Sequence, residues 1–216
     1  MGDPTQEHLA QALAWRYATK RFDPNRKIGP EDWQLLRDSL RLAPSSYGLQ
    51  PWHFTVAQSP GLRSQLLDAT GRQAQVTDCS HFVVIQSLKK LDPAHIDRYL
   101  ARVNQVQGSK PGDLAEYREH MVRTLVEGPR GKTIGEWARR QCYIAVGFLL
   151  LAAAELGIDA CPIEGIDHAA YDRILGLDSG PWASMVAVAL GYRAAEDPFQ
   201  GYAKVRFMDG DVFDHR

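Results

Sequence analysis

The stretch that decides the fold is "CYIAVGFLLLAAAE", residues 142–155. The run from Cys142 to Ala154 carries no charge and is closed by Glu155, so it is too short for a membrane span, which needs about 20 apolar residues. It predicts a helix over about 133–156, stopped by Gly157 and buried on nearly all sides. A chain of 216 residues rarely covers such a helix alone. We therefore expect a homodimer with this helix near its centre.

The segments on either side alternate between helical and extended patterns. Apolar spacing predicts strands in "HFTVAQ" (53–58), "HFVVIQS" (81–87), "DACPI" (159–163) and "WASMVAVALGY" (182–192). It predicts helices at 5–16, 28–43, 60–71 and 167–175, two more within 92–128, and an irregular tail at 199–216. Helices that enclose a few strands with long connections indicate an α+β layered fold.

Composition excludes several classes of protein. The 25 Lys and Arg balance 26 Asp and Glu, which argues against nucleic-acid binding driven by bulk charge. Three cysteines without CxxC spacing make a disulfide framework or a zinc site unexpected, and a reducing cytoplasm fits them best. The N-terminus lacks the apolar region of a secretory signal. We expect a cytoplasmic protein that binds no metal, nucleic acid or membrane.

The familiar catalytic motifs are absent from the sequence. There is no G-x-S-x-G, no H-E-x-x-H, no P-loop and no G-x-G-x-x-G. A hydrolase built on Ser45 or Ser46 with His53 is a weak alternative, because serines in P-S-S usually form turns.

Two pairs of cations remain as candidate binding groups. Arg16 and Lys20 are four residues apart and can share a helical face. Lys204 and Arg206 are two apart and point the same way in an extended chain. Either pair alone is more often a solvated surface, but together they can converge on a phosphate or an anionic ring.

Five segments together resemble one known family. "RYATKRFD", "LAPSSYGLQPWHF", "EWARRQCYIAVGFLLLAAAELGIDACPIEG", "MVAVALGY" and "KVRF" resemble, in order from Arg16 to Arg206, the nitroreductase family of FMN-dependent NAD(P)H:acceptor oxidoreductases. The most specific elements are A-P-S-S-x-x-x-Q-P-W (43–52) and P-I-E-G (162–165). The resemblance implies an α+β fold with a central mixed sheet surrounded by helices. It also implies an interlocked homodimer with one FMN per site at the subunit interface.

The resemblance also implies roles for individual residues. Arg16, in the segment with Tyr17 and Ala18, would bind the flavin phosphate together with Lys204 and Arg206. Lys20 would contact the N1/O2 edge of the flavin ring. Gln75, with Arg72 as a weaker candidate, would contact its pyrimidine. One face of the ring would rest on Pro162, Ile163, Glu164 and Gly165. Ser45, Ser46 and Gln50 would reach the cofactor from the other subunit. Ala18 lacks the hydroxyl that many relatives carry, and Gly48 stands where an asparagine is frequent.

The implied chemistry needs few catalytic side chains. Reduced flavin is negative at N1/O2, so Lys20 favours hydride uptake, and the Glu164 backbone N–H would face N5. NAD(P)H would deliver hydride, leave, and be replaced by a nitroaromatic or quinone in a ping-pong sequence. Alternatives are a dihydropteridine or enone reductase, a flavin-fragmenting or dehalogenating enzyme, or a flavin-binding store or sensor without fast turnover.

The chain is expected to form a single domain over residues 1–216 with a lid-like helical insertion at about 92–128. This insertion is polar and contains the break "GSKPG" at 108–112. Long segments of this kind are the ones expected to move. Tyr117 and Met121 are four apart and would line the acceptor pocket, or else serve ordinary helix packing.

Overall fold

A four-stranded sheet lies at the centre of the protein. A computed structural model describes residues 3–108, 110 and 112–216, so Met1, Gly2, and Ser109 and Pro111 of the predicted break lie outside the described residues. The strands are β1 (Trp52–Ala57), β2 (His81–Leu88), β3 (Asp159–Ile163) and β4 (Trp182–Gly191), in the spatial order β1-β2-β4-β3. The α+β class predicted from the sequence is confirmed.

The expectation of a mixed sheet needs a correction. All three strand pairings are antiparallel, and among the described residues the parallel pairing is an isolated bridge between Ala18 and Ala160. Parallel neighbours require a long crossover, but a long crossover does not require parallel neighbours. The connections here contain helices and still return neighbouring strands in opposite directions.

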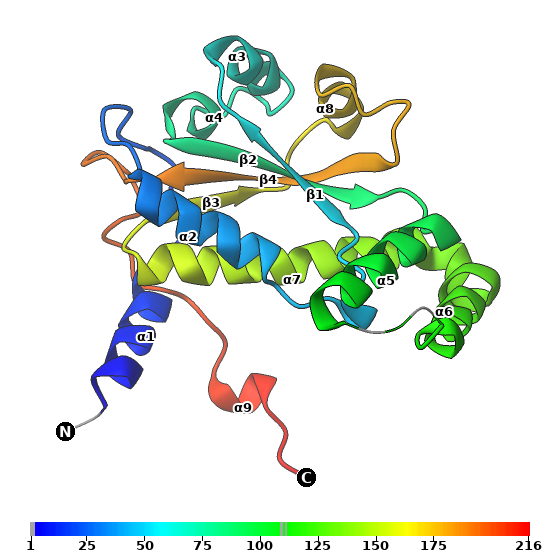
Figure 1. Cartoon of the computed structure of the whole chain (residues 1–216). Helices are drawn as coiled ribbons and strands as arrows, with labels where there is room; N and C mark the ends of the chain where they lie inside the picture. Colours follow the sequence, from blue (N-terminus) through cyan, green and yellow to red (C-terminus); the bar gives the residue numbers. More distant parts are fainter. Residues whose placement is uncertain (1–2, 109, 111) are drawn as a thin grey trace.

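Helices cover both faces of this sheet (Figure 1). One side carries the long helix α7, with α2 beside it, and the other side carries α3, α4 and α8. The helices are α1 (Pro4–Trp15), α2 (Pro30–Arg41), η1 (Ser46–Gly48), α3 (Pro60–Asp68), α4 (Gln75–Asp78), α5 (Pro93–Gln107), α6 (Ala115–Met121), η2 (Val122–Glu127), η3 (Pro129–Thr133), α7 (Ile134–Glu155), α8 (His168–Ile174) and α9 (Asp209–Val212). The short helices α4 and α9 were not predicted.

Local chemistry explains where several helices begin. A proline occupies the first turn of α3 and α5, where its missing N–H costs nothing. The side chains of Ser59, Asp92 and Asp167 accept a hydrogen bond from a free backbone N–H of the first turn of α3, α5 and α8.

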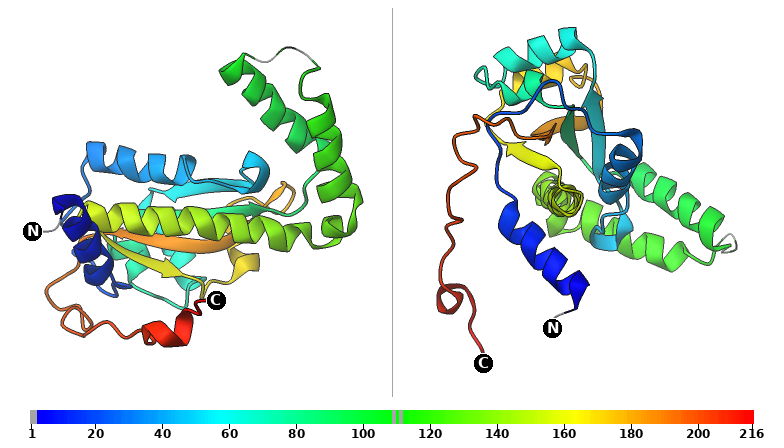
Figure 2. Two further views of the ribbon diagram at one scale, coloured as in Figure 1. Left: turned by 90° about the horizontal axis from the view of Figure 1, so that it is seen from below. Right: turned by 90° about the vertical axis from the view of Figure 1, so that its left-hand side faces the viewer.

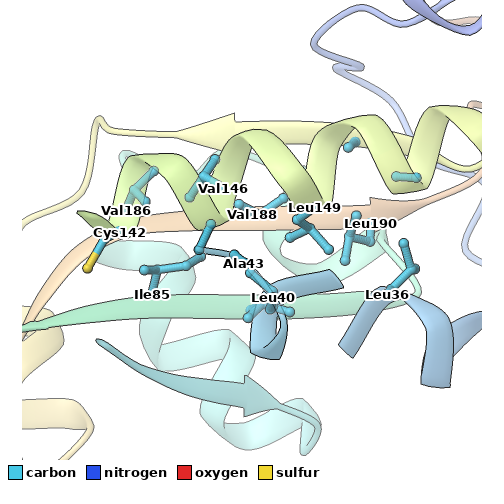
Figure 3. Packing of buried hydrophobic residues seen from close by; sticks show 14 of the residues in the cluster. Leu36, Leu40, Ala43, Ile85, Cys142, Val146, Leu149, Val186, Val188 and Leu190 are labelled. Atoms are coloured by element: carbon cyan, nitrogen blue, oxygen red, sulfur yellow. The ribbon is translucent and has the colours of Figure 1, made fainter. Parts of the chain in front are cut away.

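The main core lies between α7, α2 and the sheet. Leu36 and Leu40 of α2 point toward Leu149 of α7 and toward Val188 and Leu190 of β4 (Figure 3). All five side chains are at most 3% exposed. The packing uses one face of α7 only.

The opposite face of α7 is open in the single chain. Tyr143, Ile144, Phe148 and Leu151 are 36–46% exposed and line an almost wholly apolar cavity of ≈ 570 Å³. The sequence predicted a helix covered on nearly all sides, whereas one chain covers it on one side. Among the described residues, no helix is long and apolar enough to cross a membrane.

The two ends of α7 carry different segments. Helices α5 and α6 project beyond its N-terminal end, while α1 and the start of the C-terminal tail lie at its other end (Figure 2). The tail runs away from the body and exposes large apolar side chains: Val205, Phe207, Met208, Val212 and Phe213.

Candidate functional site

Three cations from both ends of the chain meet at one cavity. Arg16, Lys204 and Arg206 line a space of ≈ 650 Å³ together with Tyr17, Ala18 and Lys20. Lys204 is held there because its ammonium group donates to the carbonyls of Leu13, at 2.6 Å, and Arg16, at 2.5 Å.

The electrostatics of these cations point to an anion. Burial and then the charge of Arg206 lower the pKa of Arg16, and burial followed by both arginines lowers the pKa of Lys204. Within the described part of the chain, none of the three pairs with a carboxylate. Like charges gathered without a counter-ion favour a ligand such as phosphate.

Asp197 fixes the segment that carries this site. Its carboxylate accepts hydrogen bonds from the backbone N–H groups of Lys20 (2.7 Å), Arg21 (2.8 Å) and Phe199 (2.9 Å), and from the Tyr17 hydroxyl (2.9 Å). Burial alone would raise the pKa of Asp197, but these bonds outweigh it and the pKa is lowered. Sequence reasoning missed Asp197, because an Asp before a proline has the pattern of an ordinary turn.

The second part of the site lies at the end of β3. The segment after Arg16 runs beside this strand through the Ala18–Ala160 bridge, which places the Lys20 ammonium 3.8 Å from the Cys161 sulfur. Burial raises the pKa of the Cys161 thiol, whereas Lys20 and Gln75 act in the opposite sense. Lys20 and Gln75 thus both act on Cys161, the residue that precedes P-I-E-G.

Within P-I-E-G, the side chain of Glu164 has a partner on α7. The Tyr143 hydroxyl donates a short hydrogen bond to the Glu164 carboxylate. Burial and then this bond raise the pKa of Tyr143 to about 12, so the hydroxyl stays protonated. Pro162 and Ile163 close the strand, and Glu164 and Gly165 are exposed beyond it. Arg72 instead pairs with Asp68 at 2.6 Å on the surface.

The loop with Ser45, Ser46 and Gln50 is rigid. The Ser45 hydroxyl accepts from the Gln50 N–H at 2.9 Å, and the Ser46 N–H donates to the side chain of Gln141 at 2.8 Å. Tyr47 and Gln50 have positive φ values of 59° and 46°, which non-glycine residues rarely adopt. Strained backbone of this kind is concentrated at functional sites.

This loop lies far from the three cations of its own chain. It contacts Gln141 of α7, whereas α1, which leads into Arg16, contacts the other end of α7 through the His8–Glu155 pair at 3.0 Å. At 1.5 Å per residue, the two contacts are about 21 Å apart along the helix. The structure therefore brings Arg16, Lys20, Lys204 and Arg206 together near one end of α7 and leaves the serine loop at the other.

The two residues predicted for the acceptor pocket differ in burial. Met121 is fully buried in a cluster with Ile96, Leu100 and Leu125. Its position therefore fits ordinary helix packing, the alternative to a place in the acceptor pocket. Tyr117 is 38% exposed, and its ring lies 6.4 Å from that of Tyr47, next to the serine loop. Of the two, Tyr117 is the one that an external molecule can touch.

The sequence matches the model of the Nitroreductase family over residues 13–192, so the chain belongs to the nitroreductase family. A Bacillus subtilis relative, YfkO, provisionally named an NAD(P)H nitroreductase, is 38% identical over 87% of this chain and 90% of its own.

Two solved structures are similar to this fold. An Exiguobacterium sibiricum protein, provisionally named a nitroreductase and solved with FMN, has a TM-score of 0.79 at 21% identity, covering 96% of this chain and 97% of that one. CLA-ER, described as an enone reductase of gut-bacterial fatty acid saturation, has a TM-score of 0.77 at 26% identity, covering 96% and 97%.

Proposed function

We propose that this protein is an FMN-dependent oxidoreductase that passes hydride from NAD(P)H to nitroaromatic or quinone-type acceptors. The observation that carries the proposal is the cation cavity of a nitroreductase-family chain, whose Lys20 lies 3.8 Å from Cys161, the residue before the P-I-E-G segment. A phosphate needs such cations, and FMN carries one phosphate. The names of the relatives and the FMN bound to a structural neighbour agree with this reading.

Each part of the site has a role in this proposal. Arg16, Lys204 and Arg206 hold the phosphate, and Tyr17 and Ala18 form the wall beside it. Lys20 and Gln75 would hold the pyrimidine edge of the flavin, where the positive charge of Lys20 would favour its reduction. Pro162, Ile163 and Gly165 would support one face of the ring, and the Glu164 backbone N–H would serve its hydride-exchanging part. The bound flavin supplies the redox chemistry, so NAD(P)H and the acceptor use one pocket in turn.

The active unit in this proposal is an interlocked homodimer. The exposed face of α7 and the apolar tail both need cover, which a second copy supplies. A second copy would also bring its Ser45, Ser46 and Gln50 to the cations of the first, since one chain cannot. The single domain and the lid at 92–128, with Tyr117 at the acceptor, belong to the same proposal, as does a cytoplasmic setting.

A second candidate reaction is the reduction of enones. The similarity to CLA-ER favours it, because that enzyme is described as an enone reductase and matches over nearly the whole chain. Both candidates use the same cofactor and the same hydride donor, and they differ only in the acceptor.

The test is anaerobic reduction of the purified protein by NADPH or NADH, followed by a panel of a nitroaromatic, a quinone and an enone. We expect heat-released FMN, bleaching by the nicotinamide, and reoxidation by the nitroaromatic or the quinone. Reoxidation by the enone alone would favour the second candidate. Release of FAD, or a protein that binds no flavin, would exclude both.

A further inference from the structure

A second cavity lies between the serine loop and helix α5. Its volume is ≈ 510 Å³, and its walls include Gln50 from the loop and Arg98, Tyr99 and Arg102 from α5. Gln50 belongs to the loop proposed to reach the flavin of the other subunit. A molecule in this cavity would therefore extend toward that flavin.

The cavity has an excess of positive charge. Arg98 and Arg102 are four residues apart, so they stand one above the other on α5. The carboxylates of the same helix are occupied elsewhere, because Asp97 pairs with Arg118 and Asp92 caps the helix through the His95 N–H. Within the described residues, neither cavity arginine has a carboxylate partner.

His95 orients one of these arginines. Its Nε2 lies 2.6 Å from the Leu49 carbonyl, which can only accept, so Nε2 carries the proton and donates. The other ring nitrogen is then free to accept from the Arg98 guanidinium at 3.3 Å. Burial lowers the pKa of His95, which keeps the ring neutral and in this role.

Tyr99 joins the cavity to the serine loop. A Cβ at Gly48 would lie 2.3 Å from the Tyr99 hydroxyl oxygen, so only glycine permits this contact. The φ of +71° at Gly48 also favours glycine. The Tyr99 ring thus lies against Gly48 and lines the same cavity as the two arginines, where a ribose or base can pack on it.

We propose that this cavity binds the phosphorylated ribose of NADPH and makes the enzyme prefer NADPH to NADH. The inference rests on the proposed function and names the co-substrate of that site. The 2′-phosphate is the one group that distinguishes the two nicotinamides, and it is a dianion that two guanidinium groups recognise well. The unphosphorylated ribose of NADH would leave both arginines without an anionic partner.

The test compares wild-type holoenzyme with Arg98→Gln, Arg102→Gln and the double variant. Arg130→Gln is the matched control, since Arg130 is an exposed arginine of η3 outside the cavity. Each cavity substitution should raise KM for NADPH roughly ten- to hundredfold, the effect of one lost charge-assisted hydrogen bond. In the cavity variants, KM for NADH and the content of bound FMN should change less than about twofold. In the Arg130→Gln control, KM for NADPH should also change less than about twofold.

A binding measurement separates this inference from the proposed function. By calorimetry, wild-type holoenzyme should bind 2′,5′-ADP but not 5′-AMP, and the double variant should bind neither. A wild type that prefers NADH, or variants with an unchanged KM for NADPH, would overturn the inference. An effect confined to anionic acceptors would overturn it too and assign the cavity to the acceptor. A protein that binds 2′,5′-ADP without oxidising NADPH would refute the proposed reaction but not the site.

Discussion

Replacing Gly147 by arginine separates folding from assembly. Gly147 lies in the middle of the exposed apolar face of α7, and an added Cβ would meet no heavy atom within 4 Å. In an isolated chain the new side chain extends into water, and replacing a helix-interior glycine should gain about 0.5–1 kcal/mol. In a dimer packed through this face, symmetry buries two unpaired guanidinium groups, each at a cost of several kcal/mol.

The net effect on the dimer should therefore exceed a thousandfold loss of affinity, since about 1.4 kcal/mol is tenfold. Light scattering across a concentration series measures it, and FMN content should fall with the dimer fraction. Gly61→Arg is the control, because it adds the same side chain to α3 on the other side of the sheet, where an added Cβ also meets no heavy atom within 4 Å (Figure 1). A dimeric, FMN-replete Gly147→Arg protein would refute the arrangement.

Further outcomes follow from the site. Arg206→Ala should weaken FMN binding by about 1.5–3 kcal/mol, measured by flavin fluorescence quenching on apo-protein, and unchanged affinity would remove Arg206 from the phosphate site. The pKa of Asp197 is lowered in the folded protein, so its carboxylate stabilises the fold at pH values above the pKa of Asp197 in the unfolded chain. This stabilisation is lost as the pH falls through the pKa of Asp197 in the folded protein. Asp197→Asn should thus lower the melting temperature at pH 7 and flatten its fall toward pH 3, whereas parallel melting curves would contradict this. Tyr143→Phe removes the hydrogen bond that holds the side chain of Glu164 in P-I-E-G. It should slow flavin reduction, measured by stopped flow, by a larger factor than it lowers FMN content. Tyr117→Ala should change kcat/KM for bulky acceptors more than for a small quinone. Met121→Ala should instead cost about 2–5 kcal/mol of stability and slow both half-reactions equally.

The elements that local chemistry determines were predictable from the sequence. The strands and most helices, α7 above all, follow from apolar spacing, prolines in first turns and a terminal glycine. The direction of neighbouring strands did not follow, because antiparallel and helix-linked parallel strands share the same apolar patterns.

The site was predictable from the sequence only where its charged residues lie close together along the chain. Arg16 with Lys20, and Lys204 with Arg206, are close in sequence, so their pairing could be seen before their convergence. Asp197 binds a segment about 176 residues earlier, and no local pattern marks it. Likewise, helical spacing predicted that Tyr117 and Met121 share one face of a helix, but the burial of each side chain depends on which elements pack against α6.

The separation of the serine loop from the cation cavity has a consequence for mixed populations of subunits. In the proposed homodimer, each site takes its cations from one chain and its serine loop from the other. A variant that lacks Arg16, and a second that lacks Ser46, would each alone form dimers with two damaged sites. When the two are unfolded together and allowed to reassemble, half of the dimers pair one of each. In such a dimer both lesions fall in the same site, so the other is wholly intact. Tight flavin binding would return on mixing two proteins that each bind flavin weakly.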